Sequence, residues 1–443
     1  MPDEVKELHR ARELIKHALA AGADEADVYI RAGPATRITL HHTHISESNG
    51  WQQGLALRVW CGNRQALLTT NDLTSSRLLD LAKYAVAEAQ QRGMEKQPWL
   101  SSERAARPFP AAKEPPITRE QQRAMLEQLL ETIRRNQAPR KPILSACYTN
   151  IEQATIVANS RGLQATYHTS NYRIWVWVEW DTGHLMAGAS SQLFADLAPE
   201  TLVQHVSEHI ASLEASTGKA PEGSCEVLLP PLAAAEVARA FGMLLTAENV
   251  LRDLKPLLKR LGLPVASPAV TLIDDGRLAG GLKSHPFDDE GTPTGTTMLV
   301  EGGKLYALLH TLQSAAQLRV EPNGKAMRAA LWQQPHSAPS NIYLQAGEEG
   351  PDQLQRHIQR GIVVTGMLRP GRLQSATGKF TLVAQGWWVE RGERVYPVSG
   401  VPLSANIFEL LRTVRCCGSD VQFSPLADGA GAPSILIERM QVG

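Results

Sequence analysis

The spacing of apolar residues changes twice within the first 92 residues of the chain. Residues 4–22 place apolar side chains at helical spacing, and residues 21–24, Ala-Gly-Ala-Asp, predict the end of that helix. The pattern then alternates as in strands, and helical spacing returns over residues 72–92. The predicted strands cover residues 27–31, 36–45, 54–60 and 65–70. A helix, several antiparallel strands and a second helix indicate an α+β unit rather than a βαβ unit.

A proline-rich stretch separates this unit from the next one. Residues 93–118 contain five prolines, a density that breaks regular structure and predicts a linker or surface loop, and hence a sub-boundary. Helices are predicted over residues 119–136 and 199–216. Between them the pattern predicts a second sheet, with strands over residues 143–149, 154–159, 164–170 and 172–181.

The second half of the chain is predicted to consist mainly of antiparallel sheet with one helical layer. A strand over residues 224–231 ends at two prolines, and a long helical stretch follows over residues 232–263. Hairpins are predicted to turn at residues 302–303 and at residues 391–393.

Chain length and charge limit the classes of function. At 443 residues two or three domains are expected, and we predict an α+β fold with an N-terminal mixed helix and antiparallel-sheet domain in residues 1–220 and a β-rich domain in residues 221–443. Lys plus Arg (45) balances Asp plus Glu (45), so no net field attracts nucleic acid or an anionic membrane. No stretch reaches the roughly 18 apolar residues of a membrane span, and the N-terminus lacks the apolar core of a signal peptide. We expect a cytoplasmic protein.

Five cysteines are few for a chain of this length, and none lies in a C-x-x-C pair. Reduced thiols are therefore expected. The adjacent Cys416 and Cys417 fit either a redox switch or two half-buried residues that enter a strand, and the second interpretation is favoured.

Histidines are the first place to look for a hydrolytic metal site. No His-Glu dipeptide occurs, but His205, Glu208 and His209 have the H-x-x-E-H order of an inverted zincin motif. Because this predicted helix is short and polar, a solvated helix face is favoured over a metal site. Strand alternation would place His42 and His44 on one face, where two imidazoles without a third ligand favour a polar strand surface.

The densest candidate site is the acidic segment Asp288-Asp289-Glu290, which is followed by Gly291-Thr292-Pro293. Three consecutive carboxylates are costly unless they are solvated, hydrogen-bonded or close to a cation, and the residues that follow predict a fixed turn. An acidic hairpin turn without further function explains the segment equally well. No G-x-S-x-G elbow or complete P-loop is present.

Several segments of the second half together resemble the TldD/PmbA family. The similarity runs from about residue 225 to residue 422, and the first half is similar less specifically, at residues 25–28 and 54–59. The segments that carry it are Leu272–Gly276, Phe287–Pro293, Leu299–Leu305, Pro339–Leu344, Gly361–Thr365, Thr377–Phe380, Gly386–Glu390 and Tyr396–Val398.

The resemblance implies a branch of the family that lacks the zinc motif. TldD-like members carry a His-Glu-x-x-x-His helix after the strand that opens the C-terminal half, and a Cys ligand near the C-terminus. Here Ala235 and Ala240 stand where the histidines are implied, Glu236 stands where the general base is implied, and residues 428–432 contain no Cys. The resemblance is therefore to TldE/PmbA-like chains, with no cofactor in this chain and zinc in a TldD-like partner.

The resemblance further implies a heterodimer that hydrolyses peptides in a closed channel, which binds unfolded or precursor peptides by strand addition. We expect the acidic turn and Asn341 to help build the substrate cavity or the subunit interface. The candidates are Asp288, Asp289, Glu290, Gly291, Thr292 and Asn341. Two alternatives follow in order: a homodimeric peptide-binding protein without catalysis, and a peptidase with an unrecognised metal site.

Overall fold

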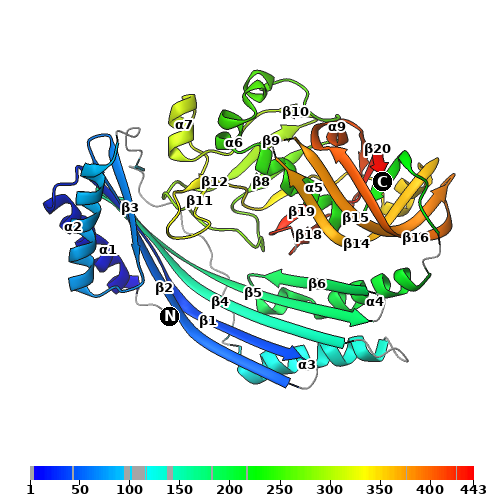
Figure 1. Ribbon diagram of the computed structural model, residues 1–443, viewed down its shortest axis with the longest axis horizontal. Helices are drawn as coiled ribbons and strands as arrows, with labels where there is room; N and C mark the ends of the chain where they lie inside the picture. The colour runs from blue at the N-terminus through cyan, green and yellow to red at the C-terminus, as the bar shows by residue number, and fades with distance from the viewer. Residues whose placement is uncertain are drawn as a thin grey trace.

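The computed structural model describes residues 4–41, 44–93, 100–101, 115, 117–136, 143–180, 183–215, 218–375, 377–425 and 427–443. It confirms the α+β class, because a large antiparallel sheet with helices is followed by β-rich units, one of which closes into a small barrel (Figure 1). Among the described helices, none combines the length and the apolarity needed to cross a membrane.

One six-stranded antiparallel sheet forms the N-terminal half. Its strands are β1 (Glu25–His41), β2 (His44–Cys61), β3 (Arg64–Thr70), β4 (Ile143–Asn159), β5 (Gln164–Trp180) and β6 (Gly183–Ser191). They lie in the order β3-β2-β1-β4-β5-β6. Because β1, β2, β4 and β5 are 17 or 18 residues long, the sheet is a long curved ribbon (Figure 1).

Two pairs of helices cover this sheet at opposite ends (Figure 1). Val28 and Ile30 of β1 pack under one pair, and Ile38 and Leu40 pack under the other. Even-numbered residues of one strand point to the same side, so both pairs cover the same face. The first pair is α1 (Glu4–Ala20) and α2 (Ser75–Gln91), and the second is α3 (Arg119–Asn136) and α4 (Pro199–Ala215).

The long strands correct two predictions. The strand predicted at residues 27–31 and most of the one predicted at residues 36–45 form one strand, β1, which ends at His41. Residues 44 and 45 belong to β2. The pairing of β1 with β4 skips Gly33 and Pro34, while its pairing with β2 continues. Proline has no N–H to donate, so only one ladder is interrupted. The predicted second sheet is wrong as well, because β4 pairs with β1 and joins the first sheet. Strand β6 was not predicted.

A second six-stranded sheet, of mixed direction, lies in the C-terminal half with the order β10-β9-β8-β13-β19-β18. Its strands are β8 (Leu272–Asp275), β9 (Thr296–Glu301), β10 (Lys304–Leu305), β13 (Ile342–Leu344), β18 (Gln422–Ser424) and β19 (Ala430–Ala432). The short elements beside it are α7 (Leu312–Leu318), α8 (Pro351–Arg356), β11 (Ala326–Met327) and β12 (His336–Ser337).

The barrel is closed by pairing between its first and last strands. The order β16-β15-β14-β7-β20 returns to β16 through Leu403 with Val442 and Ser404 with Gln441, and β17 pairs with β20 outside that ring. The strands are β7 (Gly223–Leu229), β14 (Arg360–Gln374), β15 (Lys379–Glu390), β16 (Glu393–Asn406), β17 (Val414–Cys417) and β20 (Ile435–Val442). The predicted boundary at residue 220 falls between α4 and β7.

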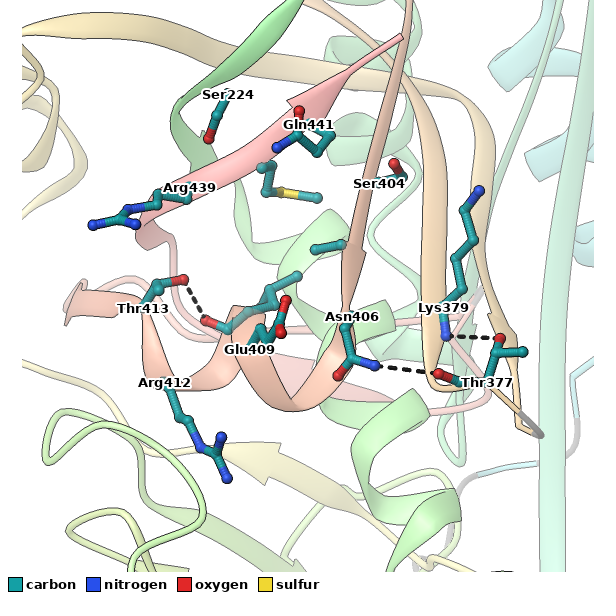
Figure 2. A pocket seen from close by; sticks show the side chains of 13 residues that line it. Ser224, Thr377, Lys379, Ser404, Asn406, Glu409, Arg412, Thr413, Arg439 and Gln441 are labelled. Carbon is teal, nitrogen blue, oxygen red and sulfur yellow. Dashed lines mark hydrogen bonds between the residues drawn. The ribbon is translucent and has the colours of Figure 1, made fainter.

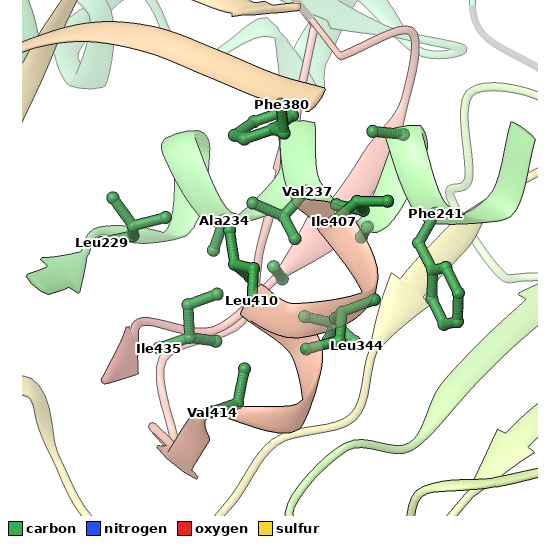
Figure 3. Packing of buried hydrophobic residues seen from close by; sticks show 14 of the residues in the cluster. Leu229, Ala234, Val237, Phe241, Leu344, Phe380, Ile407, Leu410, Val414 and Ile435 are labelled. Carbon is green, nitrogen blue, oxygen red and sulfur yellow. The ribbon is translucent and has the colours of Figure 1, made fainter. Parts of the chain in front are cut away.

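The predicted helix at residues 232–263 is three shorter helices, because Thr246 leaves the helix to form a bridge with Leu309. They are α5 (Pro231–Leu244), α6 (Ala247–Arg252) and the 3-10 helix η2 (Lys255–Arg260). Helix α5 is buried on all sides and packs against α9 (Ile407–Arg412), β14 and β19. In Figure 3, Val237 and Phe241 lie near Ile407 and Leu344. Apart from Glu236 and the partly exposed Arg239, the helix is apolar, and a helix of this kind belongs in the core.

Candidate functional site

The acidic turn lies inside the chain, at the seam between the N-terminal sheet and the C-terminal half. Asp288, Asp289 and Glu290 are 1%, 5% and 6% exposed. Side chains of β1 and β2 contact the turn directly. The segment therefore joins parts of the chain that lie far apart in the sequence.

Asp288 holds the turn itself in shape. Its carboxylate accepts hydrogen bonds from the backbone N–H groups of Glu290 (3.0 Å), Thr292 (2.9 Å) and Ala326 (2.9 Å). Burial raises the pKa of Asp288, the charge of Glu290 raises it further, and the three donors act in the opposite direction. Gly291 sits at φ +82°, a conformation that favours glycine.

Asp289 connects the turn to β1. It accepts hydrogen bonds from the Tyr29 hydroxyl (2.8 Å), the Arg31 guanidinium (3.3 Å) and the backbone N–H of Arg328 (2.6 Å). Burial, and then the charge of Asp289, raises the pKa of Tyr29 well above its ordinary value. The Tyr29 hydroxyl therefore stays protonated and remains a donor.

Glu290 connects the turn to β2. It accepts hydrogen bonds from Arg58 Nη1 (3.3 Å) and from the backbone N–H of Leu312 (2.8 Å). Nε of Arg58 also lies 2.9 Å from both carboxylate oxygens of Asp27. Burial raises the pKa of Glu290 and the charge of Arg58 opposes that effect. These charges are buried, paired and hydrogen-bonded. Removing one partner would leave the other buried and uncompensated, which destabilises the fold strongly.

Asn341 belongs to a different hydrogen-bond network from that of the acidic turn. It is fully buried, and its side chain holds the loop after β8 by accepting from the backbone N–H of Lys283 (2.8 Å) and donating to the Asp275 carbonyl (2.8 Å) and the Ser284 hydroxyl (2.9 Å). Thr292 is 5% exposed. The structure thus brings residues 288–292 together and places Asn341 in a separate hydrogen-bond network. The role of these residues in a substrate cavity or subunit interface stays a prediction.

The sequence analysis missed the partners of the acidic turn. Tyr29, Arg31 and Arg58 lie more than 230 residues before the carboxylates they contact. It also missed the ion pair of Lys325 and Asp274, whose side chains are both fully buried. The cost of a buried carboxylate run gave the signal that cations must lie near, but local sequence does not say which ones.

Helix α5 carries the positions at which the family resemblance implies zinc ligands. Ala235 and Ala240 are 0% and 2% exposed, and Glu236 is 1% exposed. The Glu236 carboxylate accepts hydrogen bonds from Arg239 Nε (3.2 Å) and Nη2 (3.1 Å), one turn further along the same helix. Burial raises the pKa of Glu236 and the charge of Arg239 opposes that effect. Arg239 was missed, although its i,i+3 spacing is visible in the sequence.

The residues around α5 do not fit a zinc ion. Zinc requires nitrogen, sulfur or oxygen donors, usually four, and the two alanines offer methyl groups. Strand β19, which contains Ala430 and Ala432, packs against α5 and adds no donor side chain. Across the described residues, no group of three or more His, Cys, Asp and Glu is placed to hold a metal ion.

The two histidine clusters lie in different elements, and the structure describes each of them only in part. Strand β1 ends at His41 and β2 begins at His44, and these two residues are cross-strand partners. His42 lies outside the described residues, so the expectation that His42 and His44 share one strand face stays a prediction. His205 lies half-buried on α4, while the side chains of Glu208 and His209 lie outside the described part.

The adjacent cysteines are the last two residues of β17, and both are free thiols. Burial raises the pKa of Cys417 to about 12, with Cys416 adding to the effect, and burial also raises the pKa of Cys416. Thiols of this kind are protonated at neutral pH and react slowly. The cysteines lie in a strand as the favoured interpretation expected, but they end it, and only Cys416 is half-buried while Cys417 is buried.

An open polar pocket of about 650 Å³ lies between β15, β16, α9 and β20 (Figure 2). Lys379, Arg412 and Arg439 line it together with hydroxyl and amide groups. Figure 2 shows the three cationic side chains pointing away from one another. Binding of one anion requires donors that converge, so the pocket is not built for that purpose.

Comparison with known proteins gives this architecture a family. Residues 222–443 match the PmbA/TldA metallopeptidase C-terminal domain. The matched part contains α5, the acidic turn and the barrel, and it makes up half of the chain. The chain belongs to the PmbA/TldD metallopeptidase family.

Curated relatives are metalloproteases. The chain is 32% identical over 234 residues to a metalloprotease of Methanothermobacter thermautotrophicus, covering 50% of this chain and 51% of that protein. It is 25% identical over 446 residues to metalloprotease MJ0996 of Methanocaldococcus jannaschii, covering 95% of this chain and 97% of that protein. It is 29% identical over 217 residues to metalloprotease PmbA of Escherichia coli O157:H7, covering 48% and 45%. For two of these three relatives the match thus spans about half of their length.

Solved structures share the whole fold. A Thermotoga maritima protein described as a candidate modulator of a DNA gyrase superposes with a TM-score of 0.85 at 24% identity, covering 99% of this chain and 100% of that chain. TldE from Thermococcus kodakarensis superposes with a TM-score of 0.81 at 16% identity, covering 98% and 100%. At these identities the likeness establishes the architecture alone.

Proposed function

We propose that this chain is the non-metal subunit of a TldD/TldE-type heterodimeric zinc metallopeptidase. In this assembly it forms part of a peptide-binding channel for unfolded or precursor peptides, and a TldD-like partner carries the zinc. The proposal is carried by helix α5, where Ala235 and Ala240 offer no metal donor and Arg239 holds the carboxylate of Glu236. Membership of a metallopeptidase family supports peptide-bond hydrolysis as the reaction of the complex.

The residues of this chain supply shape to the channel. The acidic turn fixes the N-terminal sheet against the C-terminal half through Arg58, Arg31 and Tyr29. A channel wall must keep one geometry while peptides enter and leave, and sites held by rigid elements do so best. A zinc ion bound in the partner would supply the activated water for hydrolysis.

Reconstitution tests the proposal. This chain and a TldD-like chain, purified separately, are each assayed with zinc and an unfolded peptide, and then assayed together. We expect no hydrolysis by this chain alone and hydrolysis by the mixture, because only the partner has a complete donor set. Substitution of Glu236→Gln in this chain should leave the activity of the mixture intact, since this carboxylate faces no metal.

Hydrolysis by this chain alone, lost in the Glu236→Gln variant, would contradict the proposal. A matched control is Glu226→Gln, which alters a carboxylate of β7 that accepts from the backbone N–H of Gln359 (2.6 Å), away from the implied zinc position on α5.

A further inference from the structure

The ladder between β9 and β10 ends early and leaves an opening at the edge of the mixed sheet. Strand β10 pairs with β9 only at Val300 and Glu301, and its other side forms bridges with Leu261 and Pro264. Just beyond β10 the Tyr306 N–H still donates to the Leu299 carbonyl (2.8 Å). Beyond β10 the chain turns to another neighbour, because Leu309 donates to the Leu245 carbonyl (3.0 Å) and accepts from the Ala247 N–H (2.8 Å). The two segments therefore separate beside the first residues of β9.

The first three residues of β9, Thr296–Met298, have a strand neighbour on one side only. Strand β8 pairs with them. In the described part of the chain, no backbone hydrogen bond reaches them from the side of the opening. An unpaired strand edge is a template for a further extended segment, which gains main-chain hydrogen bonds there.

A pocket of about 640 Å³ occupies this opening, and its lining is largely apolar. Leu261, Tyr306 and Val320 line it and are 46%, 51% and 47% exposed. Glu321 is the one acidic or basic side chain among the described residues of the lining, apart from His310. Burial lowers the pKa of His310 and the charge of Glu248 opposes that effect, so the imidazole is neutral at neutral pH. Clustered, half-exposed apolar side chains mark interaction sites.

The opening lies at the opposite edge of the sheet from helix α5. Helix α5 contacts β13, β18 and β19, whereas the opening lies at β9 and β10. A ligand here therefore occupies a different place from the implied zinc position. It requires neither a metal ion nor a partner subunit for binding.

We propose that this opening binds an extended peptide segment with an apolar side chain, which adds to β9 as a further strand. The free edge of Thr296–Met298 supplies affinity that does not depend on sequence. The space between Leu261, Tyr306 and Val320 receives one apolar side chain, and Glu321 disfavours an acidic one. The inference rests on the proposed function in taking an unfolded peptide as the ligand.

Fluorescence anisotropy of this chain purified alone tests the inference. The probe is a short labelled peptide of alternating Val and Thr. We expect the Val320→Asp variant to bind it about tenfold more weakly, because a charge then enters the apolar space. The matched control is Val395→Asp, which alters an equally exposed valine of β16 outside the pocket (53% exposed) and should bind as the wild type does. Tyr306→Asp repeats the test at a second position.

A second probe separates strand addition from simple apolar contact. The same peptide carrying N-methyl groups on alternate amides keeps its side chains but loses donors, and it should no longer bind. Equal binding to the wild type and Val320→Asp, undiminished binding of the methylated peptide, or no binding to the wild type would each overturn the inference. So would a change of oligomeric mass in Val320→Asp, because the surface would then belong to a second copy of this chain.

These outcomes are independent of catalysis. The proposed function fails if this chain alone binds zinc or hydrolyses peptides, whereas the present inference fails if peptide binding ignores Val320 and the backbone amides. Each failure is visible while the other proposal stands.

Discussion

The seam and helix α5 both contain buried carboxylates, but they compensate that burial in different ways. At the seam, Asp289 and Glu290 receive donors from β1, β2 and the backbone of the C-terminal half. On α5, the one partner of Glu236 among the described residues is Arg239, which belongs to the same helix. The first arrangement connects distant segments, and the second neutralises a single charge locally.

This difference separates carboxylates that connect distant elements from a carboxylate that is compensated within its own helix. Carboxylates that several elements satisfy together hold those elements in register, so their removal disturbs the whole chain. A carboxylate that one neighbouring arginine satisfies holds nothing else in place. The acidic run, which was the densest candidate site in the sequence, therefore holds the two halves of the chain together. Helix α5 has alanines in place of metal donors at the implied zinc position.

The largest effect is expected at the seam. Arg58→Met removes the hydrogen-bonded cation of the buried Asp27 and Glu290, and the remaining Arg328 lies 4.0 Å from Asp27. We expect the variant to lower the free energy of unfolding by about 3–5 kcal/mol. Urea denaturation followed by circular dichroism measures this change. The control is Arg135→Met, which removes an exposed pair with Glu131 and should leave the free energy of unfolding nearly unchanged. Equal and small changes in the free energy of unfolding of both variants would contradict the structural role of the seam.

A smaller loss is expected on α5. Ala240→His introduces an imidazole where the alanine is 2% exposed, and overpacking there should lower the free energy of unfolding by about 1–3 kcal/mol. Ala20→His, at an exposed position at the end of α1, is the control and should be nearly neutral. If added zinc fully restored the stability of Ala240→His, the wild-type site would be a metal centre that lacks only one ligand, contrary to our account.

The buried carboxyl group of Glu236 should contribute to the pH dependence of the free energy of unfolding. Burial raises the pKa of Glu236 above its ordinary 4.5, so the folded state holds that proton more tightly than the unfolded state does. The contribution of Glu236 to stability is therefore present below the unfolded-state pKa and is lost as the pH rises through the folded-state pKa. Glu236→Gln should flatten this part of the profile of unfolding free energy against pH. An unchanged profile would show that Arg239 compensates the burial completely.

The smallest effect is expected for the ion pair of Lys283 with Asp428, whose carboxylate side chain is 58% exposed. Solvent screens such a pair, so Lys283→Met should change the free energy of unfolding by no more than about 1 kcal/mol. Thermal unfolding of this variant and of Arg58→Met in one buffer compares the two directly. A loss for Lys283→Met as large as that for Arg58→Met would contradict the distinction between buried and exposed pairs.

The sequence predicted the local features of both regions. The turn at Gly291 and the helix that becomes α5 follow from glycine placement and apolar spacing, and both are present. Alternation also located most strands, and the α+β class followed from their order. These features depend on interactions between near neighbours, which a single sequence contains.

Long-range pairing was outside the reach of the sequence. The pairing of β1 with β4 joins residues more than 100 positions apart, and alternation within a strand does not name its partner. For the same reason Arg58 was not recognised as the cation of the acidic turn. The position of Glu236 came from the resemblance to the family, and its pairing with Arg239 was within reach of the sequence through their i,i+3 spacing.

The metal content of this chain, purified alone without chelator, tests the central claim most directly. Our account predicts almost no transition metal, because Ala235 and Ala240 stand where donors would be needed. About one equivalent of zinc per chain would contradict the account. It would direct attention to His205, Glu208 and His209 as ligands.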